Sequence, residues 1–399
     1  MICKVINKKI NPFMSFGKMP IANGFLYEED FKKEFFFDLK VGFSEDLSLF
    51  QLQNHPTPEQ MFNERYPFFT GSSEFMKNHF YNFAEFIKKN YLKNNSKIIE
   101  IGSNDGTCLQ NFKKTNIEYI GFEPSANVAN IAKKRGINTL NNFFNLEALD
   151  LVKDYKKNTS VIFAANVICH VPNLINLIKS VDQLLTSDGV FIFEEPYLGS
   201  MFKKTSYDQI YDEHVFMFSG TSIQKIFNLF DMELVDLIKQ STHGGSMRYV
   251  IARKGKKTIN KNVYLILDEE KLANLDNLTS CIEFKKNCEM SKKKIVETLH
   301  NYKSKEKKIC GYAATSKSTT VLNYCGLDKS FINCIYDSTK EKIGKFTPGT
   351  HIPIKSTESF NLYKPEIAYL FAWNHKEEIF NKEKIFLKRG GKWISHVDI

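Results

Sequence analysis

The first stretch of the sequence that could do chemistry is a turn that combines glycines with carboxylates. The isoleucine-rich run 97–101 leads into Gly102, and Gly106 follows after three small polar residues. This pattern predicts a buried strand, a tight turn and the start of a helix. Ligands of nucleotide-binding α/β sheets bind beyond the carboxyl ends of the strands. Because Glu100 and Asp105 would repel a pyrophosphate there, the turn favours a cationic ligand with a sulfonium and a free amino group.

A further carboxylate strengthens this interpretation. Glu123 ends the next predicted strand, 119–124, about 20 residues after the glycine turn. A carboxylate at that position can accept hydrogen bonds from both hydroxyls of an adenosine ribose. Strands and helical stretches alternate from here to about residue 194, which predicts a parallel, doubly wound sheet and therefore an α/β fold.

Three later stretches also contain side chains that could take part in catalysis or binding. Residues 206–214 are unusually dense in titratable side chains, and a polar, glycine-containing turn at 242–249 precedes another strand. The structural alternative for this second stretch is a simple turn at Gly244-Gly245, with Arg248 as a surface charge. Strand 308–312 runs into a loop of small residues and then a helix, with Lys317 at the turn. Backbone N–H groups at such a helix start favour a phosphate, and the alternative is a capped helix in a purely structural domain.

Composition limits the class of protein. The chain has 399 residues, of which 42% are hydrophobic and 25% charged, which is ordinary for two or three globular domains. It has no apolar run long enough to cross a membrane and no secretory signal pattern at its start. The eight cysteines are scattered, mostly in apolar surroundings, so we expect reduced thiols and a cytoplasmic location.

The net charge of +10 does not by itself indicate a nucleic-acid partner. The lysines form short pairs and triplets rather than a basic stripe with interleaved aromatics, so we expect neither a nucleic acid nor a membrane as partner. A solvated surface explains the charge, and attraction of a phosphate-bearing substrate is the functional alternative. The oligomeric state stays open.

Changes of pattern along the chain predict four segments. A small, irregular N-terminal unit covers 1–75, and the alternating α/β unit covers 76–255. A charged helical connector covers 256–307, and a second, smaller Rossmann-like unit covers 308–399.

The motifs, taken in order, resemble one family. The set resembles the SAM-dependent sugar C-methyltransferases of deoxysugar pathways, of the kijanose and mycarose type, over essentially the whole chain. Each motif alone is weak, but their order is specific, and they occupy residues 100–106, 121–129, 165–172, 211–214, 242–248, 348–354 and 371–375. The resemblance implies a class I Rossmann-like SAM methyltransferase domain with a small N-terminal domain and a second Rossmann-like C-terminal domain.

The resemblance also implies a reaction and a set of residues. A nucleoside-diphosphate 4-keto-deoxysugar would lose a proton beside its ketone, and the enolate would attack the methyl group of S-adenosylmethionine. His214 is the leading base, Glu213 supports it or replaces it, and Tyr211 donates to the enolate oxygen. The cofactor would contact Glu100, Gly102, Asn104, Asp105, Gly106, Glu123, Pro124 and Asn166. The substrate would contact Tyr66, His170, Lys317, Asn374 and His375.

One departure from the family concerns zinc. The family has two C-x-x-C pairs in its N-terminal domain, but here the partner position of Cys3 is Ile6, and the second pair falls on Ser44 and Leu47. One thiol cannot form a closed tetrahedral site. We therefore expect no metal and no zinc, with the domain held by its phenylalanine-rich core.

Three alternatives remain at this point. The methyl acceptor could be a sugar oxygen or a different sugar carbon. The chain could methylate nucleic acid, as its basic charge suggests. It could also be a nucleotide-sugar-binding protein without catalysis, although the intact turn at 100–106 and Glu123 speak against that.

Overall fold

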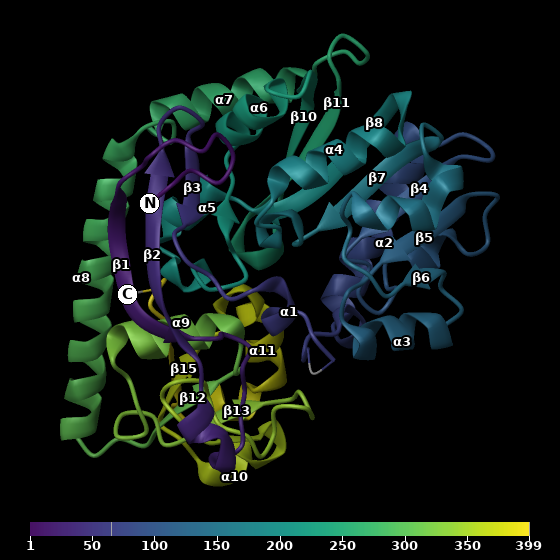
Figure 1. Ribbon diagram of the computed structural model, residues 1–399. Coiled ribbons are helices and arrows are strands. Elements are labelled where there is room, and N and C mark those ends of the chain that lie inside the picture. The colour runs from purple at the N-terminus through teal and green to yellow at the C-terminus, as the bar shows by residue number, and fades with distance from the viewer. Residues whose placement is uncertain (65, 399) are drawn as a thin grey trace.

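Among residues 1–64 and 66–398, which the computed structural model describes, the strands form three sheets (Figure 1). The N-terminal sheet is antiparallel and has the order β1-β2-β3-β9. Its strands are β1 (Pro12–Pro20), β2 (Phe36–Ser44), β3 (Leu49–Leu52) and β9 (Phe216–Met217). The last strand comes from the middle of the chain, where Met217 pairs with Phe50. The sheet is therefore completed by a segment far away in sequence.

The central sheet has seven strands in the order β10-β11-β8-β7-β4-β5-β6. Strand β11 is antiparallel to both of its neighbours, β10 and β8. Strands β8, β7, β4, β5 and β6 are parallel to one another. The α/β prediction is therefore confirmed for this domain. The strands are β4 (Lys97–Ile101), β5 (Glu118–Phe122), β6 (Thr139–Leu140), β7 (Thr159–Ala165), β8 (Leu185–Pro196), β10 (Met232–Gln240) and β11 (Ser246–Arg253).

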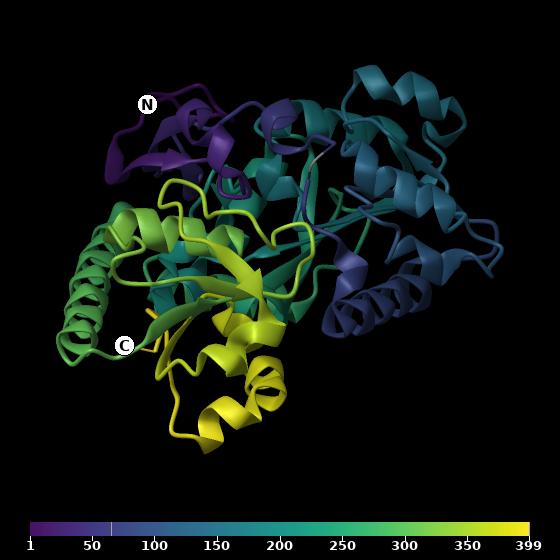
Figure 2. The same ribbon diagram turned by 90° about the horizontal axis from the view of Figure 1, so that it is seen from below.

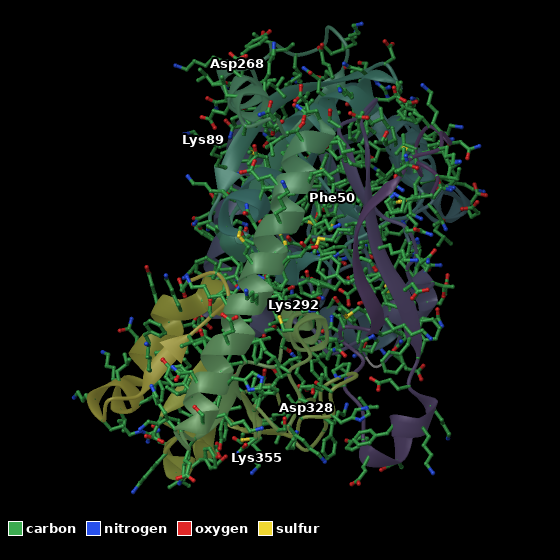
Figure 3. All side chains as sticks on the ribbon, turned by 90° about the vertical axis from the view of Figure 1, so that its left-hand side faces the viewer. Phe50, Lys89, Asp268, Lys292, Asp328 and Lys355 are labelled. Atoms are coloured by element: carbon green, nitrogen blue, oxygen red, sulfur yellow. The ribbon has the colours of Figure 1, made fainter. Side chains whose placement is uncertain are left out.

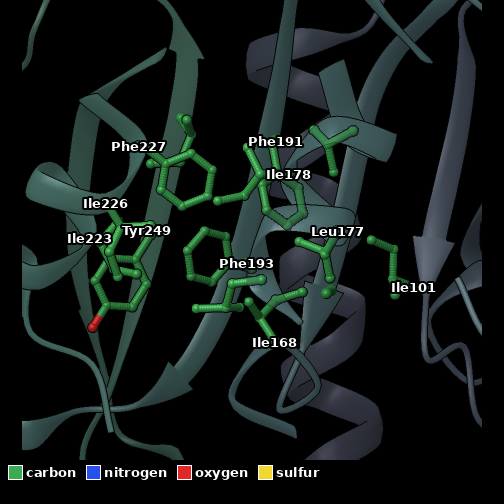
Figure 4. Close-up of a cluster of buried hydrophobic side chains, with 14 of the residues drawn as sticks. Ile101, Ile168, Leu177, Ile178, Phe191, Phe193, Ile223, Ile226, Phe227 and Tyr249 are labelled. Carbon is green, nitrogen blue, oxygen red and sulfur yellow. The ribbon is translucent and has the colours of Figure 1, made fainter. Parts of the chain in front are cut away.

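Apolar side chains from both faces of this sheet bury the parallel strands. Figure 4 shows one such cluster, in which Phe191 and Phe193 of β8 lie between residues of the flanking helices. The ring centroids of Phe193 and Phe227 are 6.0 Å apart, and those of Phe193 and Tyr249 are 5.0 Å apart. Such double-sided burial explains why the strands appear as continuous apolar runs in the sequence.

The C-terminal sheet is wholly parallel, with the order β14-β13-β12-β15-β16. Its strands are β12 (Ile309–Tyr312), β13 (Ile335–Asp337), β14 (Ile354–Ser356), β15 (Ile367–Leu370) and β16 (Lys392–Ile394). Strand β12 leads directly into helix α9 (Ser316–Cys325). This is the strand, loop and helix arrangement that the sequence around Lys317 predicts.

The connector consists of α7 (Lys261–Leu272) and the long α8 (Leu278–Ser304). In Figure 3, α8 crosses the front of the molecule between the N-terminal sheet and the C-terminal domain. Its Phe284 and Ile295 belong to the same apolar cluster as Phe50 of β3 and Val321 of α9. The outer domains therefore share a core along α8.

The remaining helices cover the sheets or support loops. They are α1 (Pro58–Met61), α2 (Glu74–Tyr91), α3 (Ala126–Lys134), α4 (Leu174–Leu184), α5 (Leu198–Lys204), α6 (Gly220–Asn228), α10 (Phe360–Tyr363), α11 (Lys376–Lys382) and α12 (Lys384–Lys388). No helix within the described residues is long and apolar enough to cross a membrane. The eight cysteines are all buried, and none forms a disulfide in the described part of the chain.

Candidate active site

A cavity of about 1310 Å³ lies where the N-terminal, central and C-terminal domains meet. Figure 2 views the three domains from below, with the yellow C-terminal domain facing the reader. The cavity is lined by every predicted site residue except Gly106. The structure thus brings the predicted cofactor and substrate residues into one space, although they lie on different domains.

The two glycines of the turn after β4 have different roles. Gly102 has φ +67°, and a Cβ there would lie 2.3 Å from Cγ2 of Val167, so only glycine fits at the cavity wall. Gly106 also has a positive φ, +78°, but a Cβ there would meet Ile137 behind the turn. Gly106 therefore shapes the turn through packing and lies outside the cavity lining.

Two of the predicted cofactor residues hold each other in place. Glu123 Oε2 accepts a hydrogen bond from the backbone N–H of Asn104 at 3.1 Å, and its Oε1 accepts one from the N–H of Ser125 at 2.7 Å. The side chain of Asn104 accepts a hydrogen bond from the N–H of Thr70 at 2.9 Å. The ends of β4 and β5 are thereby linked to each other and to the loop that precedes α2.

The two carboxylates at the turn, those of Asp105 and Glu100, differ in their hydrogen-bond partners. Asp105 accepts hydrogen bonds from Gly71 and Thr107 and lies 3.1 Å from the guanidinium of Arg135. Glu100 is buried, and its Oε2 has no hydrogen-bond partner among the described residues. Burial, followed by the carboxylates of Asp105 and Glu123, raises the pKa of Glu100 well above its ordinary value. Asp105 therefore ties the turn to the adjoining loop, whereas Glu100 has bonding capacity left at the cavity.

Asn166 lies on a loop that is supported by Glu195. The residue has φ +57°, and its buried Oδ1 has no partner among the described residues. Glu195 Oε1 accepts hydrogen bonds from the N–H groups of Val167 at 3.0 Å and Ile168 at 2.6 Å. Burial raises the pKa of Glu195 to about 7. Glu195 is thus a functional support that sequence reasoning missed, because the residues it contacts follow a different strand.

Tyr211 and His214 form the closest pair of predicted catalytic side chains. Their Oη and Nε2 atoms are 2.8 Å apart, and His214 Nδ1 lies 2.7 Å from the backbone carbonyl of Gln209. Because a carbonyl can only accept, Nδ1 carries the proton and Nε2 is the acceptor. Burial lowers the pKa of His214 to about 4, so the ring is neutral at pH 7. The arrangement presents a neutral imidazole whose one ring lone pair, on Nε2, accepts a hydrogen bond from the Tyr211 hydroxyl at the cavity.

Glu213 is held from the N-terminal domain. Its Oε1 accepts a hydrogen bond from Asn23 Nδ2 at 2.6 Å, and its Oε2 accepts one from the Tyr66 hydroxyl at 3.4 Å. The neighbouring Asp212 accepts a hydrogen bond from the N–H of Ala22 at 2.8 Å. Burial, and then the carboxylate of Asp212, raise the pKa of Glu213 above its ordinary value. The N-terminal domain therefore supplies part of the active-site wall.

The C-terminal domain contributes the cationic wall. Lys317, in the first turn of α9, is buried and donates to Asn374 Oδ1 at 3.1 Å. Lys340 and Lys342 also line the cavity there, and neither was singled out from the sequence. The N–H of the Trp373 indole donates to Asp208 Oδ2 at 2.6 Å, and this bond joins the C-terminal domain to the 206–214 segment. The lysine-bearing wall and the 206–214 segment are thus fixed relative to each other.

The alternative interpretation of Arg248 as a surface charge was wrong. Its guanidinium is buried and pairs with Glu194, with 2.7 Å between Nε and Oε1. His79 of α2 lies 2.5 Å from the other oxygen of Glu194. Burial alone would raise the pKa of Glu194, but the bonds from His79 and the charge of Arg248 outweigh it and lower the pKa. The pair joins β8 and β11 to α2 beneath the cofactor side of the cavity.

Family models match nearly the whole chain in three consecutive pieces. Residues 75–237 match a model described as "Methyltransferase domain", and residues 241–397 match one described as "C-methyltransferase C-terminal domain". Residues 2–62 match a model described as "Putative zinc binding domain".

One curated relative is similar over most of the chain. The C-methyltransferase NovU of Streptomyces niveus is 28% identical over 96% of this chain and 91% of its own. Solved structures resemble only part of the chain. The YcgJ protein of Bacillus subtilis matches 45% of this chain and 100% of its own at 14% identity and TM-score 0.36. A SAM-dependent methyltransferase of Aquifex aeolicus matches 42% and 87% at 12% identity and TM-score 0.34. These two scores are too low to support any argument.

The expectation that zinc is absent was wrong. The N-terminal residues match a zinc-binding model despite their single thiol, and three side chains that could hold a metal ion lie together elsewhere. The ligand atoms of Cys169, His170 and His214 all lie within 4.8 Å of one another, and the two histidines line the cavity. The C-x-x-C positions of the N-terminal domain give no information about side chains that folding brings together elsewhere.

The residues of this cluster fit a zinc ion. A thiolate and two imidazoles are a donor set that zinc uses when a fourth position stays open. His170 Nε2 is buried without a hydrogen-bond partner among the described residues. The contact of His214 Nδ1 with the Gln209 carbonyl is the kind of outer contact that orients a metal-binding imidazole.

The matches to a methyltransferase domain and to a C-methyltransferase C-terminal domain, and the similarity to NovU, agree with the glycine turn and with the parallel central sheet. The protein is therefore a SAM-dependent C-methyltransferase, with a methyltransferase domain between an N-terminal zinc-binding-type domain and a C-terminal domain built on a parallel sheet.

Proposed function

We propose that the protein transfers the methyl group of S-adenosylmethionine to a carbon beside the ketone of a nucleoside-diphosphate 4-keto-deoxysugar. The observation that carries this proposal is the shared cavity, which joins the glycine turn, the Tyr211–His214 pair and the lysines of the C-terminal domain. A nucleoside diphosphate is anionic and of suitable size to bind the lysines of the C-terminal domain. Bound there, it would place its sugar between those lysines and the glycine turn.

The anionic part of the acceptor is assigned to Lys317 and the loop before it. The buried ammonium of Lys317 lies at the first turn of α9, where backbone N–H groups also favour an anion. Asn374 and His375 line the same side of the cavity. Together with Lys340 and Lys342, these groups would bind the diphosphate and orient the sugar toward the central domain.

The reaction needs a base, a donor for the enolate oxygen and an aligned methyl group. The base takes a proton from the carbon beside the ketone, and the electron pair of that C–H bond forms the enolate. The enolate carbon then forms a bond to the methyl group while the bond from methyl to sulfur breaks, leaving S-adenosylhomocysteine. Holding the enolate carbon, the methyl carbon and the sulfur in line removes much of the entropic part of the barrier.

His214 Nε2 is the preferred base, and Glu213 is the alternative. The ring of His214 is neutral at pH 7, and its Nε2 lone pair would be freed to take the proton when the Tyr211 hydroxyl turns from Nε2 to the enolate oxygen. His170 and Tyr66 lie on the same side of the cavity and would contact the sugar. Zinc held by Cys169, His170 and His214 would supply a Lewis acid beside the acceptor. In that case His214 would be a ligand and Glu213 would act as the base.

Mass spectrometry after incubation with SAM and a panel of nucleotide 4-ketosugars tests this proposal. We expect one sugar of the panel to gain a single methyl group, and carbon NMR of the product should place that group on carbon. A methyl group on oxygen would contradict the enolate mechanism. Absence of transfer to every ketosugar, in a preparation that binds SAM by calorimetry, would contradict the acceptor class.

A further inference from the structure

We infer that Asn23, in the N-terminal domain, is a positioning residue for methyl transfer because its side-chain amide orients the carboxylate of Glu213. The inference rests on the proposed function, in which Glu213 supports or replaces His214 as the base. Asn23 lies in the loop between β1 and β2, outside the sequence motifs described above.

The loop around Asn23 contacts the catalytic segment at two consecutive positions. The backbone N–H of Ala22 donates to Asp212 at 2.8 Å, and Asn23 Nδ2 donates to Glu213 at 2.6 Å. The two partners are also consecutive in the sequence, so the two segments meet in a fixed register. Glu213 could not turn away from Asn23 without also straining the hydrogen bond between Ala22 and Asp212.

The loop is itself anchored on the far side. The carbonyl of Ala22 accepts a hydrogen bond from Thr319 Oγ1 of α9 at 2.9 Å, and Ala22 is only 1% exposed. Another α9 hydroxyl, that of Thr320, donates to the carbonyl of Ile210 at 3.0 Å. Helix α9, which carries Lys317, therefore holds both the loop and the segment that contains Glu213. Asn23 is thus fixed in position relative to Glu213.

The chemistry of an amide suits the role. The NH₂ group of Asn23 can only donate, so it holds Oε1 of Glu213 as an acceptor. The second oxygen is left facing the Tyr66 hydroxyl, 3.4 Å away. Asn23 is only partly buried and lines the cavity, whereas the N-terminal sheet is held by apolar side chains such as Phe16 and Val41. Removing the amide should therefore disturb Glu213 more than the fold.

Three substitutions of Asn23 test the inference in the full chain. We expect Asn23→Ala to lower kcat by roughly 10- to 100-fold, because the buried carboxyl group of Glu213 loses the donor that orients it. The KM for SAM should stay unchanged, which a general loss of structure would not allow. Asn23→Gln retains the donor and should recover part of kcat, whereas Asn23→Asp places two carboxylates together and should be the least active. Equal kcat for Asn23→Ala and the unmodified protein would overturn the inference.

A measurement that needs no methyl acceptor tests this inference separately from the proposed function. Hydrogen–deuterium exchange of segment 209–215 should become faster in Asn23→Ala than in Asn11→Ala, whose side chain is exposed on the same domain. Faster exchange together with no methyl transfer by the unmodified protein to any ketosugar would refute the proposed acceptor and keep the positioning contact. Unchanged exchange would refute the contact, whatever the acceptor.

Discussion

The two sides of the cavity are built in different ways. The side proposed for the cofactor is made largely by one domain, with a glycine turn and two strand ends whose backbone groups hold Glu123. The side proposed for the acceptor combines Asn23 and Tyr66 from the N-terminal region, the 211–214 segment, and Lys317 from the C-terminal domain. A cofactor site that depends on local backbone shape leaves a motif in the sequence. An acceptor site assembled across domains leaves only scattered side chains.

The largest difference between the sides should appear on replacing His214. We expect His214→Asn to lower turnover by roughly 100- to 10,000-fold, the usual contribution of a general base, and to leave the SAM dissociation constant unchanged. Calorimetry and a methyl-transfer assay measure the two quantities, with the exposed His300→Asn as control. Full turnover in His214→Asn would exclude it as the base. A loss of bound zinc in this variant would assign His214 to the metal instead.

The reverse pattern is expected for Gly102. A methyl group there would collide with Val167 at a positive φ, so Gly102→Ala should weaken SAM binding by roughly 100-fold or more. Gly255 is the matched control, because it also has a positive φ, +72°, but has no neighbour within 4 Å of an added Cβ. Gly255→Ala should retain SAM binding. Equal affinities for the two variants would show that the close approach to Val167 does not matter.

A smaller effect, confined to the acceptor side, is expected for Lys317. Lys317→Met removes the buried ammonium while keeping most of the length of the side chain, and it should raise the acceptor KM by roughly 10-fold. The exposed Lys355→Met, on β14 of the same domain, should leave that KM unaltered. Steady-state kinetics at varied acceptor concentration measure the acceptor KM of both variants. A comparable loss in SAM affinity would mean that the two sides are not separable.

The last prediction concerns the metal, and the substitution that tests it removes only one sulfur atom. We expect zinc, measured by elemental analysis of the purified protein, to be lost in Cys169→Ala if the cavity cluster binds it. Cys3→Ala, in the N-terminal domain, is then expected to retain the metal. The opposite result would place the zinc with the N-terminal domain and leave His214 free to act as the base.

The features that depend on short-range pattern could be predicted from the sequence. The apolar runs at β4, β5 and β7 and the glycine at position 102 are enough to identify the central sheet and its ligand edge. Contacts between distant residues leave no such pattern. Asn23 lies 190 residues from Glu213, and the metal-binding cluster unites Cys169 with His214, so neither has a characteristic spacing.

Burial of charge was equally hard to foresee. Arg248 follows a glycine-containing turn and resembles a surface residue, but its partner Glu194 lies on a strand 54 residues earlier. Composition cannot indicate that such a pair will be enclosed together. Only the pairing of β11 with β8 brings the two side chains face to face.

The short strand β9 has a consequence for engineering this protein. Because Phe216 and Met217 complete the N-terminal sheet, that domain cannot be cut out or exchanged as an independent module. An excised N-terminal domain that ended before residue 216 would expose the unpaired edge of β3, and an open apolar edge promotes aggregation; a graft from a relative would pair its β3 with the β9 of a different sequence. Recombination among such enzymes would succeed only if β9 travels with the sheet that it closes.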